Sequence, residues 1–252
     1  MSRKTVLVLG DSHTQALASA HKARAGREPK PDDVQFEIHW LAKRKREIRI
    51  GDLELAEADE RATQLQSDDM MVISIAGTLH NVLGLLQHDK PFDLYTRGES
   101  TTPVEGRVVV PENALWDMFK GMTDPKKKIL ALRRKARCPV YHLATPPPKE
   151  DGEFIKARVA RYRDRLVAEV GVNAPATRLK LWKLEMRVLA HLCAEGSMQL
   201  VLPPVEAQTP EGFLKPEYYA NDATHANAGY GELVLRQLEA LAAATPLAKE
   251  TA

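Results

Sequence analysis

Short apolar runs recur along the chain and alternate with longer amphipathic stretches. Continuous apolar runs predict buried strands at residues 5–9, 70–75, 139–143 and 198–202, and alternation of apolar and polar residues predicts a half-buried strand at 34–41. Helical periodicity predicts helices at 14–25, 53–66, 112–137 with an interruption near 124–125, 151–170, 175–195 and 227–243, and the segment 76–81 leads into a short helix through about 87. Residues 90–111 are expected to be irregular or paired as a small hairpin.

This order of elements predicts the fold class. Strands that alternate with helices through short connections form a parallel, doubly wound sheet, here of about five strands, in a three-layer α/β/α sandwich. No repeat, low-complexity tract or linker divides the 252 residues, so a single domain over 1–252 is expected.

The turn after the first strand carries the most informative polar residues. Gly10-Asp11-Ser12-His13 follows the apolar run directly, and open α/β sheets bind ligands outside the carboxyl ends of their strands. A serine becomes a nucleophile when a base, itself oriented by a third group, takes its proton. Near the other end of the sequence, Asp222-Ala-Thr-His225 supplies both groups. The chain has no Gly-x-Ser-x-Gly segment, so the nucleophile elbow of α/β-hydrolases is excluded.

These two segments resemble the first and last sequence blocks of the SGNH/GDSL hydrolases. The spacing between them and the β/α alternation suit the flavodoxin-like sandwich of that family, so the resemblance covers essentially the whole chain. It implies ester hydrolysis with Ser12 as nucleophile, His225 as general base and then acid, and Asp222 as the group that orients His225. It further implies an oxyanion hole made by the Ser12 amide, a glycine amide from a second block, and an asparagine from a Gly-x-Asn-Asp block.

The sequence departs from this family pattern at the oxyanion hole. Ala76-Gly77-Thr78-Leu79-His80-Asn81 follows the second apolar strand, with Thr78 in the place of the asparagine and Asn81 three residues later. Either Asn81 or the Thr78 hydroxyl supplies the donor, or the hole lacks one, which typically slows catalysis by about 10²–10³. No second-block glycine is evident, since Gly51 comes late after its strand. The expected substrate pocket is formed by Gly77, Thr78, Asn81, His80, His13 and His142.

The same residues are compatible with three alternative roles. Ser12, Asp222 and His225 could cap helices, and His80 and His142 could pack in the interior. Asp11, His13, His80, His142 and His225 could instead hold two metal ions in a phosphoesterase, although the remaining blocks of that class are missing. A non-catalytic binding protein on the same fold is the third possibility.

Composition adds few constraints. With 44% hydrophobic residues, 28% charged residues and a net charge of +2, the chain is typical of globular proteins and gives no indication of nucleic-acid binding. Basic runs such as 43–46 are typical of solvated surfaces or of a site for an anionic substrate. Two cysteines in apolar contexts predict reduced thiols, and the absence of a secretory signal or membrane span favours a cytoplasmic location.

The resemblance therefore implies an SGNH-type esterase that acts on a small-molecule or glycan ester, and it alone makes a carbohydrate O-acetyl ester the favoured substrate. Transfer of the acyl group to an acceptor other than water would use the same triad. No cofactor or metal is expected, and the oligomeric state is left open.

Overall fold

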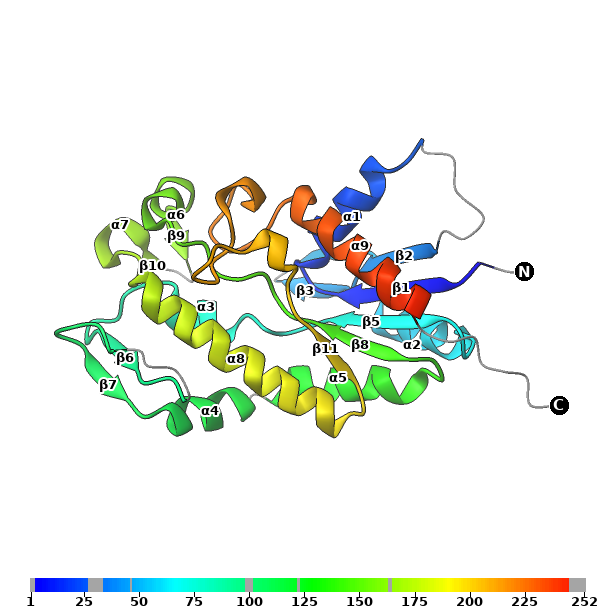
Figure 1. Cartoon of the computed structure of the whole chain (residues 1–252), viewed down its shortest axis with the longest axis horizontal. Helices are drawn as coiled ribbons and strands as arrows, with labels where there is room; N and C mark the ends of the chain where they lie inside the picture. Colours follow the sequence, from blue (N-terminus) through cyan, green and yellow to red (C-terminus); the bar gives the residue numbers. More distant parts are fainter. Residues whose placement is uncertain are drawn as a thin grey trace.

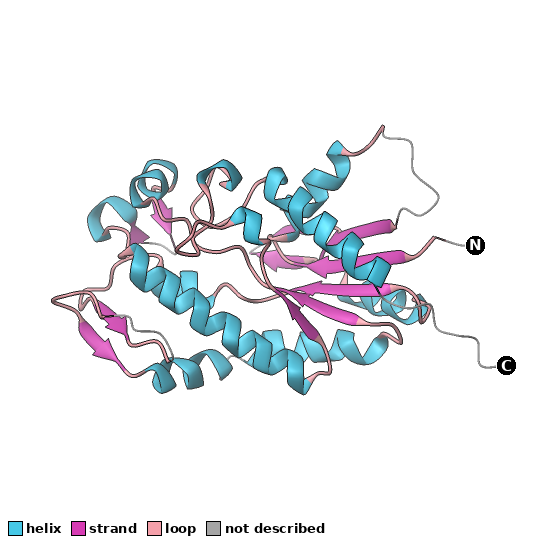
Figure 2. Ribbon diagram, viewed as in Figure 1, coloured by secondary structure: helices cyan, strands magenta, loops and turns pink. Residues whose placement is uncertain are grey.

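The computed structural model describes residues 3–26, 34–45, 47–97, 102–121, 123–162 and 165–244. Its centre is a five-stranded sheet in the order β11-β8-β5-β1-β2, and every neighbouring pair is parallel (Figures 1 and 2). The strands are β1 (Thr5–Gly10), β2 (Gln35–Trp40), β5 (Met70–Ser74), β8 (Val140–Leu143) and β11 (Gln199–Val201). The parallel sheet of about five strands that the sequence predicts is confirmed.

Helices cover both faces of this sheet. One face carries α1 (Thr14–Ala23) and α9 (Ala228–Ala244), which lie side by side in Figure 1. The other face carries α2 (Leu55–Gln64), α5 (Thr123–Lys135) and α8 (Pro175–Glu195). The remaining helices are α3 (Leu79–Gly84), α4 (Glu112–Lys120), α6 (Gly152–Arg158), α7 (Val167–Val170) and the 3₁₀ turns η1 (Val205–Ala207) and η2 (Pro216–Tyr218).

The alternation of side chains along β1 explains the two layers. Leu7 and Leu9 join the hydrophobic core on the α8 side, whereas Val6 and Val8 join the core on the α1 and α9 side. All four are buried, as expected for a central strand with both faces covered. This packing fixes the position of the turn that leaves β1.

Three small strand pairs lie outside the main sheet. β3 (Lys43–Lys45) and β4 (Ile48–Ile50) form an antiparallel hairpin, as do β9 (Arg161–Tyr162) and β10 (Arg165–Leu166). β6 (Phe92–Leu94) and β7 (Val108–Val110) pair in parallel, so of the two structures expected for residues 90–111 the hairpin is wrong, while the other described residues of this segment are irregular. The predicted helix at 151–170 is likewise divided into α6, the β9–β10 hairpin and α7. Arg46 of the first basic run lies outside the described residues.

The strand order places one crevice at the carboxyl edge of the sheet. The chain leaves β1 for β2 on one side and returns to β5 on the other, which makes the ends of β1 and β5 the switch point of the sheet. None of the helices in the described part of the chain is both long and apolar enough to cross a membrane.

Candidate active site

Ser12 lies on a tight turn at this switch point. The Asp11 amide donates to the Ser74 carbonyl of β5 at 3.0 Å, which draws the turn against the neighbouring strand. A Cβ added to Gly10 would approach the same carbonyl oxygen to 2.5 Å, so the close contact requires glycine. The helix α1 begins two residues later, without a side-chain cap from Ser12. The Ser12 hydroxyl is therefore available for another partner.

That partner is supplied by the loop between η2 and α9. Asp222 Oδ1 accepts hydrogen bonds from the amides of Thr224 and His225, each at 2.8 Å. Its other oxygen, Oδ2, lies 2.9 Å from His225 Nδ1. Burial by itself raises the pKa of the Asp222 carboxyl, but the hydrogen bonds from the His225 ring and the two amides outweigh it, and the net shift is downward. The carboxylate is ionised and holds a proton on His225 Nδ1.

The side chains of Ser12, His225 and Asp222 form one hydrogen-bond network. His225 Nε2 lies 2.9 Å from Ser12 Oγ, although the two residues are 213 positions apart in the sequence. With the proton on Nδ1, Nε2 is an acceptor that faces the serine hydroxyl. This is the arrangement in which an imidazole can take a serine proton. The start of α9 is capped by Asn227 Oδ1, which accepts from the amides of Gly229 and Tyr230, so neither Asp222 nor His225 serves as that cap.

His13 forms a wall of this site. Its ring centroid lies 4.8 Å from that of His225, and its side chain is buried. Burial lowers the pKa of His13 to about 3, with the neighbouring His225 acting in the same direction, so the ring is neutral at pH 7. Ser12, His13, Asp222 and His225 line an open depression of about 200 Å³. Both sequence segments thus reach the same surface.

The structure identifies a candidate for the second-block glycine that the sequence hid. Gly51 follows the β3–β4 hairpin, which loops out of the sheet, and returns to the end of β2. A Cβ on Gly51 would lie 2.7 Å from the carbonyl oxygens of Trp40 and Leu41, and its φ of +98° also favours glycine. Among the described residues, no acceptor binds the amide of Ser12 or that of Gly51. The amide of Ser12 thus follows the end of β1, and that of Gly51 packs against the end of the neighbouring strand β2.

The turn after β5 is held in an unusual backbone conformation. Ala76 and Gly77 both have positive φ, at 69° and 80°. Thr145 Oγ1 donates to the Gly77 carbonyl at 2.7 Å and fixes the turn from the end of β8.

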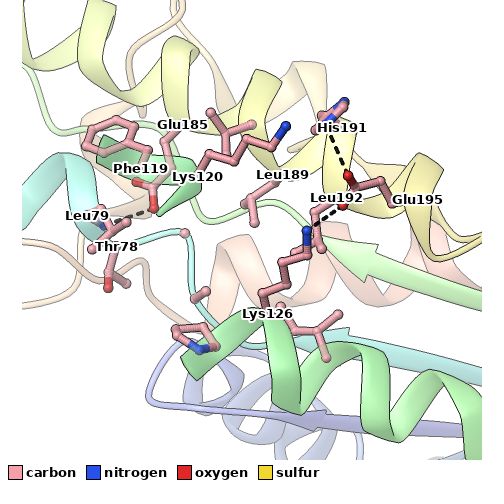
Figure 3. A pocket seen from close by; sticks show the side chains of 15 residues that line it. Thr78, Leu79, Phe119, Lys120, Lys126, Glu185, Leu189, His191, Leu192 and Glu195 are labelled. Atoms are coloured by element: carbon pink, nitrogen blue, oxygen red, sulfur yellow. Dashed lines mark hydrogen bonds and ion pairs between the residues drawn. The ribbon is translucent and has the colours of Figure 1, made fainter. Parts of the chain in front are cut away.

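Asn81 and Thr78, the two residues considered as the side-chain donor, have different surroundings. Asn81 is buried on α3, its side-chain amide makes no hydrogen bond to any described residue, and it is not among the residues that line the depression beside Ser12. Thr78 instead borders a separate, mainly apolar cavity of about 90 Å³ among α4, α5 and α8 (Figure 3). The depression beside Ser12 and this cavity share no lining residue.

Two of the expected pocket histidines are packed beneath the site. His80 is buried against Glu185 of α8, whose carboxylate accepts from the His80 ring at 2.7 Å and from the amides of Leu79 and His80. His142 is fully buried in β8, where Nε2 donates to the Ile75 carbonyl at 2.8 Å and burial lowers the pKa of the ring to about 4. Both side chains support the turn after β5 and do not line an open surface.

The side chains considered for a dimetal site do not gather. In the described part of the chain, no three His, Cys, Asp or Glu side chains are grouped so that they could hold a metal ion. Among the five residues considered, His142 and His80 are engaged with Ile75 and Glu185, and His225 with Asp222 and Ser12. The geometry gives no support to the dimetal alternative.

Comparisons with known proteins find only distant structural neighbours. No family model matches the chain, and no curated protein matches it. Among solved structures, a carbohydrate acetylesterase family member from Sinorhizobium meliloti is 13% identical, with 94% of this chain and 96% of that chain covered and a TM-score of 0.48. A protein provisionally designated an SGNH hydrolase, from Slackia heliotrinireducens, is 11% identical, with coverage of 95% and 98% and a TM-score of 0.45. The assignment of the site rests on its own geometry.

Proposed function

We propose that the protein is a serine hydrolase that cleaves a small acyl ester through a Ser12-His225-Asp222 triad. The observation that supports this most is the series of two 2.9 Å contacts, from Ser12 Oγ to His225 Nε2 and from His225 Nδ1 to Asp222 Oδ2. These contacts join a turn at the switch point of the sheet to a loop 213 residues away. Neither helix capping nor core packing explains why these three side chains lie in contact.

The chemistry follows from these contacts. Ser12 Oγ attacks the ester carbonyl while its proton passes to His225 Nε2, and the imidazolium is stabilised by the Asp222 carboxylate. The proton then goes to the leaving alcohol, which gives an acyl-enzyme on Ser12. Water attacks the acyl-enzyme with His225 again as the base. The free amides of Ser12 and Gly51 and the Asn81 side chain are the proposed donors to the oxyanion.

The open depression of about 200 Å³ beside Ser12 has room for a small acyl group. A carbohydrate O-acetyl ester is the substrate that we propose, and it rests on the family resemblance. Transfer to a sugar hydroxyl in place of water uses the same intermediate. Product analysis with and without an added acceptor sugar separates the two reactions.

A fluorophosphonate probe tests the proposal directly. We expect an adduct on Ser12 by peptide mass spectrometry in the wild type, and none in Ser12→Ala or His225→Ala. Ser19→Ala is the matched control, since Ser19 lines the same depression without contacting His225, and it should label like the wild type. If Ser12 of the folded wild type stays unlabelled, the proposal is wrong. Bound metal in that sample would then favour a phosphoesterase, and its absence a binding protein.

A further inference from the structure

Lys149 is among the most deeply buried charged side chains of the described structure. It follows the proline run after β8, and only 2% of its surface is exposed. Removing an ammonium from water is strongly unfavourable unless acceptors surround it. A buried lysine outside the proposed triad therefore needs partners of its own.

Those partners belong to the loop that carries the triad carboxylate. Lys149 Nζ donates to the Ala220 carbonyl at 2.7 Å and to the Asp222 carbonyl. It also lies 3.7 Å from Asp222 Oδ1. The rings of Phe154 and Tyr219 lie 4.9 and 5.1 Å from the ammonium, within the range of cation–π attraction. One side chain thus holds two carbonyls and faces the carboxylate of the same short loop.

Lys149 is itself fixed from α8. Arg178, which is also buried, donates to the carbonyls of Lys149 and Glu150 and, through Nε, to the Asn173 carbonyl at 3.1 Å. The backbone from which Lys149 projects is thereby tied to the longest helix of the fold. The polar contacts run from Arg178 through Lys149 to Asp222, and from there to His225 and Ser12.

We propose that Lys149 is a positioning residue for the triad: its buried ammonium holds the 220–222 backbone so that the Asp222 carboxylate faces His225. This rests on the proposed function for its effect on catalysis. The geometric part does not, because the contacts exist whether or not Ser12 reacts. Burial lowers the pKa of Lys149 to about 8, with Asp222 opposing the shift, so the ammonium is the main form at neutral pH.

Lys149→Met tests the role, because methionine keeps the length of the side chain and removes the charge and the donors. With a small activated ester, we expect kcat and the rate of fluorophosphonate labelling of Ser12 to fall about tenfold to a hundredfold, with KM within twofold of wild type. The control is the double variant Asp93→Asn/Lys180→Met, which removes the other buried lysine together with its 2.8 Å carboxylate partner, away from Asp222. It should label at the wild-type rate. A labelling rate within twofold of wild type in folded Lys149→Met, or an equal loss in the control, would overturn the proposal.

A spectroscopic measurement separates this proposal from the proposed function. The His225 Nδ1 proton, hydrogen-bonded to Asp222, should give a downfield proton resonance in the wild type that is lost or broadened in Lys149→Met. That result supports Lys149 even if Ser12 never labels, whereas an unchanged resonance refutes it even if Ser12 does. If Lys149→Met does not fold, a measurement on the wild-type protein tests the proposal instead. Coupling across hydrogen bonds between Lys149 Nζ and the carbonyl carbons of Ala220 and Asp222 is expected, and its absence would refute the proposal.

Discussion

Asp222 contacts two kinds of group at once. One oxygen accepts two backbone amides and so shapes the loop, while the other faces the His225 ring. The first role needs only an acceptor, and an amide oxygen can fill it. The second needs a carboxylate, because only an ionised partner keeps the proton on Nδ1 and stabilises the imidazolium.

Asp222→Asn separates these two roles. We expect ester turnover to fall by about 10⁴ while the melting temperature changes little, since the Asn oxygen can still accept from Thr224 and His225. Steady-state kinetics and thermal unfolding monitored by circular dichroism check the two halves. Turnover near the wild-type level would remove Asp222 from the triad.

The side-chain donor of the oxyanion hole can be assigned by comparing two variants. Asn81→Ala should lower kcat by about 10²–10³ with a smaller change in KM, because the Asn81 amide has no partner among the described residues. Thr78→Val should have little effect, since Thr78 borders the separate cavity. The reverse order would assign the donor to Thr78.

Sequence reasoning finds the residues whose roles are marked by the residues next to them in the sequence. Asp222 and His225 lie in one turn, and Ser12 follows a strand whose apolar run is unmistakable, so local sequence is enough to propose them. The roles proposed for Lys149 and Gly51 are not predicted from the sequence, because they depend on contacts between distant segments. A lysine directly after Pro146-Pro147-Pro148 resembles a surface residue, and Gly51 is separated from β2 by a hairpin that no apolar run marks.

At the scale of elements, helix α8 contributes buried charged side chains as well as an apolar face. Its apolar stripe predicts a buried face, but Arg178, Lys180 and Glu185 of the same helix are buried as well. Each has a partner in a different segment: the Lys149 backbone, Asp93 of β6, and the amides that begin α3. Helical periodicity predicts a face from apolar residues alone, so it could not show that charged side chains of α8 are buried as well.

His142, a buried residue of strand β8, should make the stability of the protein depend on pH. His142 in the folded protein has a pKa of about 4, against about 6.5 when exposed in the unfolded chain. Between these values the unfolded state binds more protons, so the free energy of unfolding falls as pH falls from 6.5 to 4, by at most about 1.4 kcal/mol per pH unit for this group.

His142→Gln should reduce that dependence. Glutamine can still donate to the Ile75 carbonyl but does not titrate, so urea unfolding between pH 6.5 and 4 should show a shallower loss of stability than in wild type. His13 also titrates low because it is buried, and it will leave part of the slope. An unchanged slope would show that His142 is not the group responsible.

At the scale of the whole molecule, the crossing of α1 and α9 sets the distance between Ser12 and His225. Ser12 lies just before α1 and His225 just before α9, and the two helices meet at Gly231, where an added Cβ would lie 2.1 Å from the Ala16 carbonyl oxygen. Arg24 adds ion pairs to Glu232 and Glu239 along the same contact.

Gly231→Ala should therefore affect stability and chemistry together. Backbone atoms cannot yield as a side chain can, so we expect a loss of about 1–3 kcal/mol and labelling of Ser12 at least tenfold slower. Ala240→Gly, at an exposed position of the same helix, should cost about 1 kcal/mol without slowing the labelling. If both variants label at the same rate, the crossing does not control the 2.9 Å contact.

The separation of Ser12 from His225 also bears on synthesis of the protein. During translation the sheet strands from β1 to β11 leave the ribosome before the 220–225 loop and α9, so a nascent chain would carry an unactivated hydroxyl for most of its elongation. On our proposal, reactivity toward a fluorophosphonate begins only when α9 docks on α1. Labelling of stalled ribosome–nascent chain complexes of increasing length would then report when the last layer of the sandwich closes.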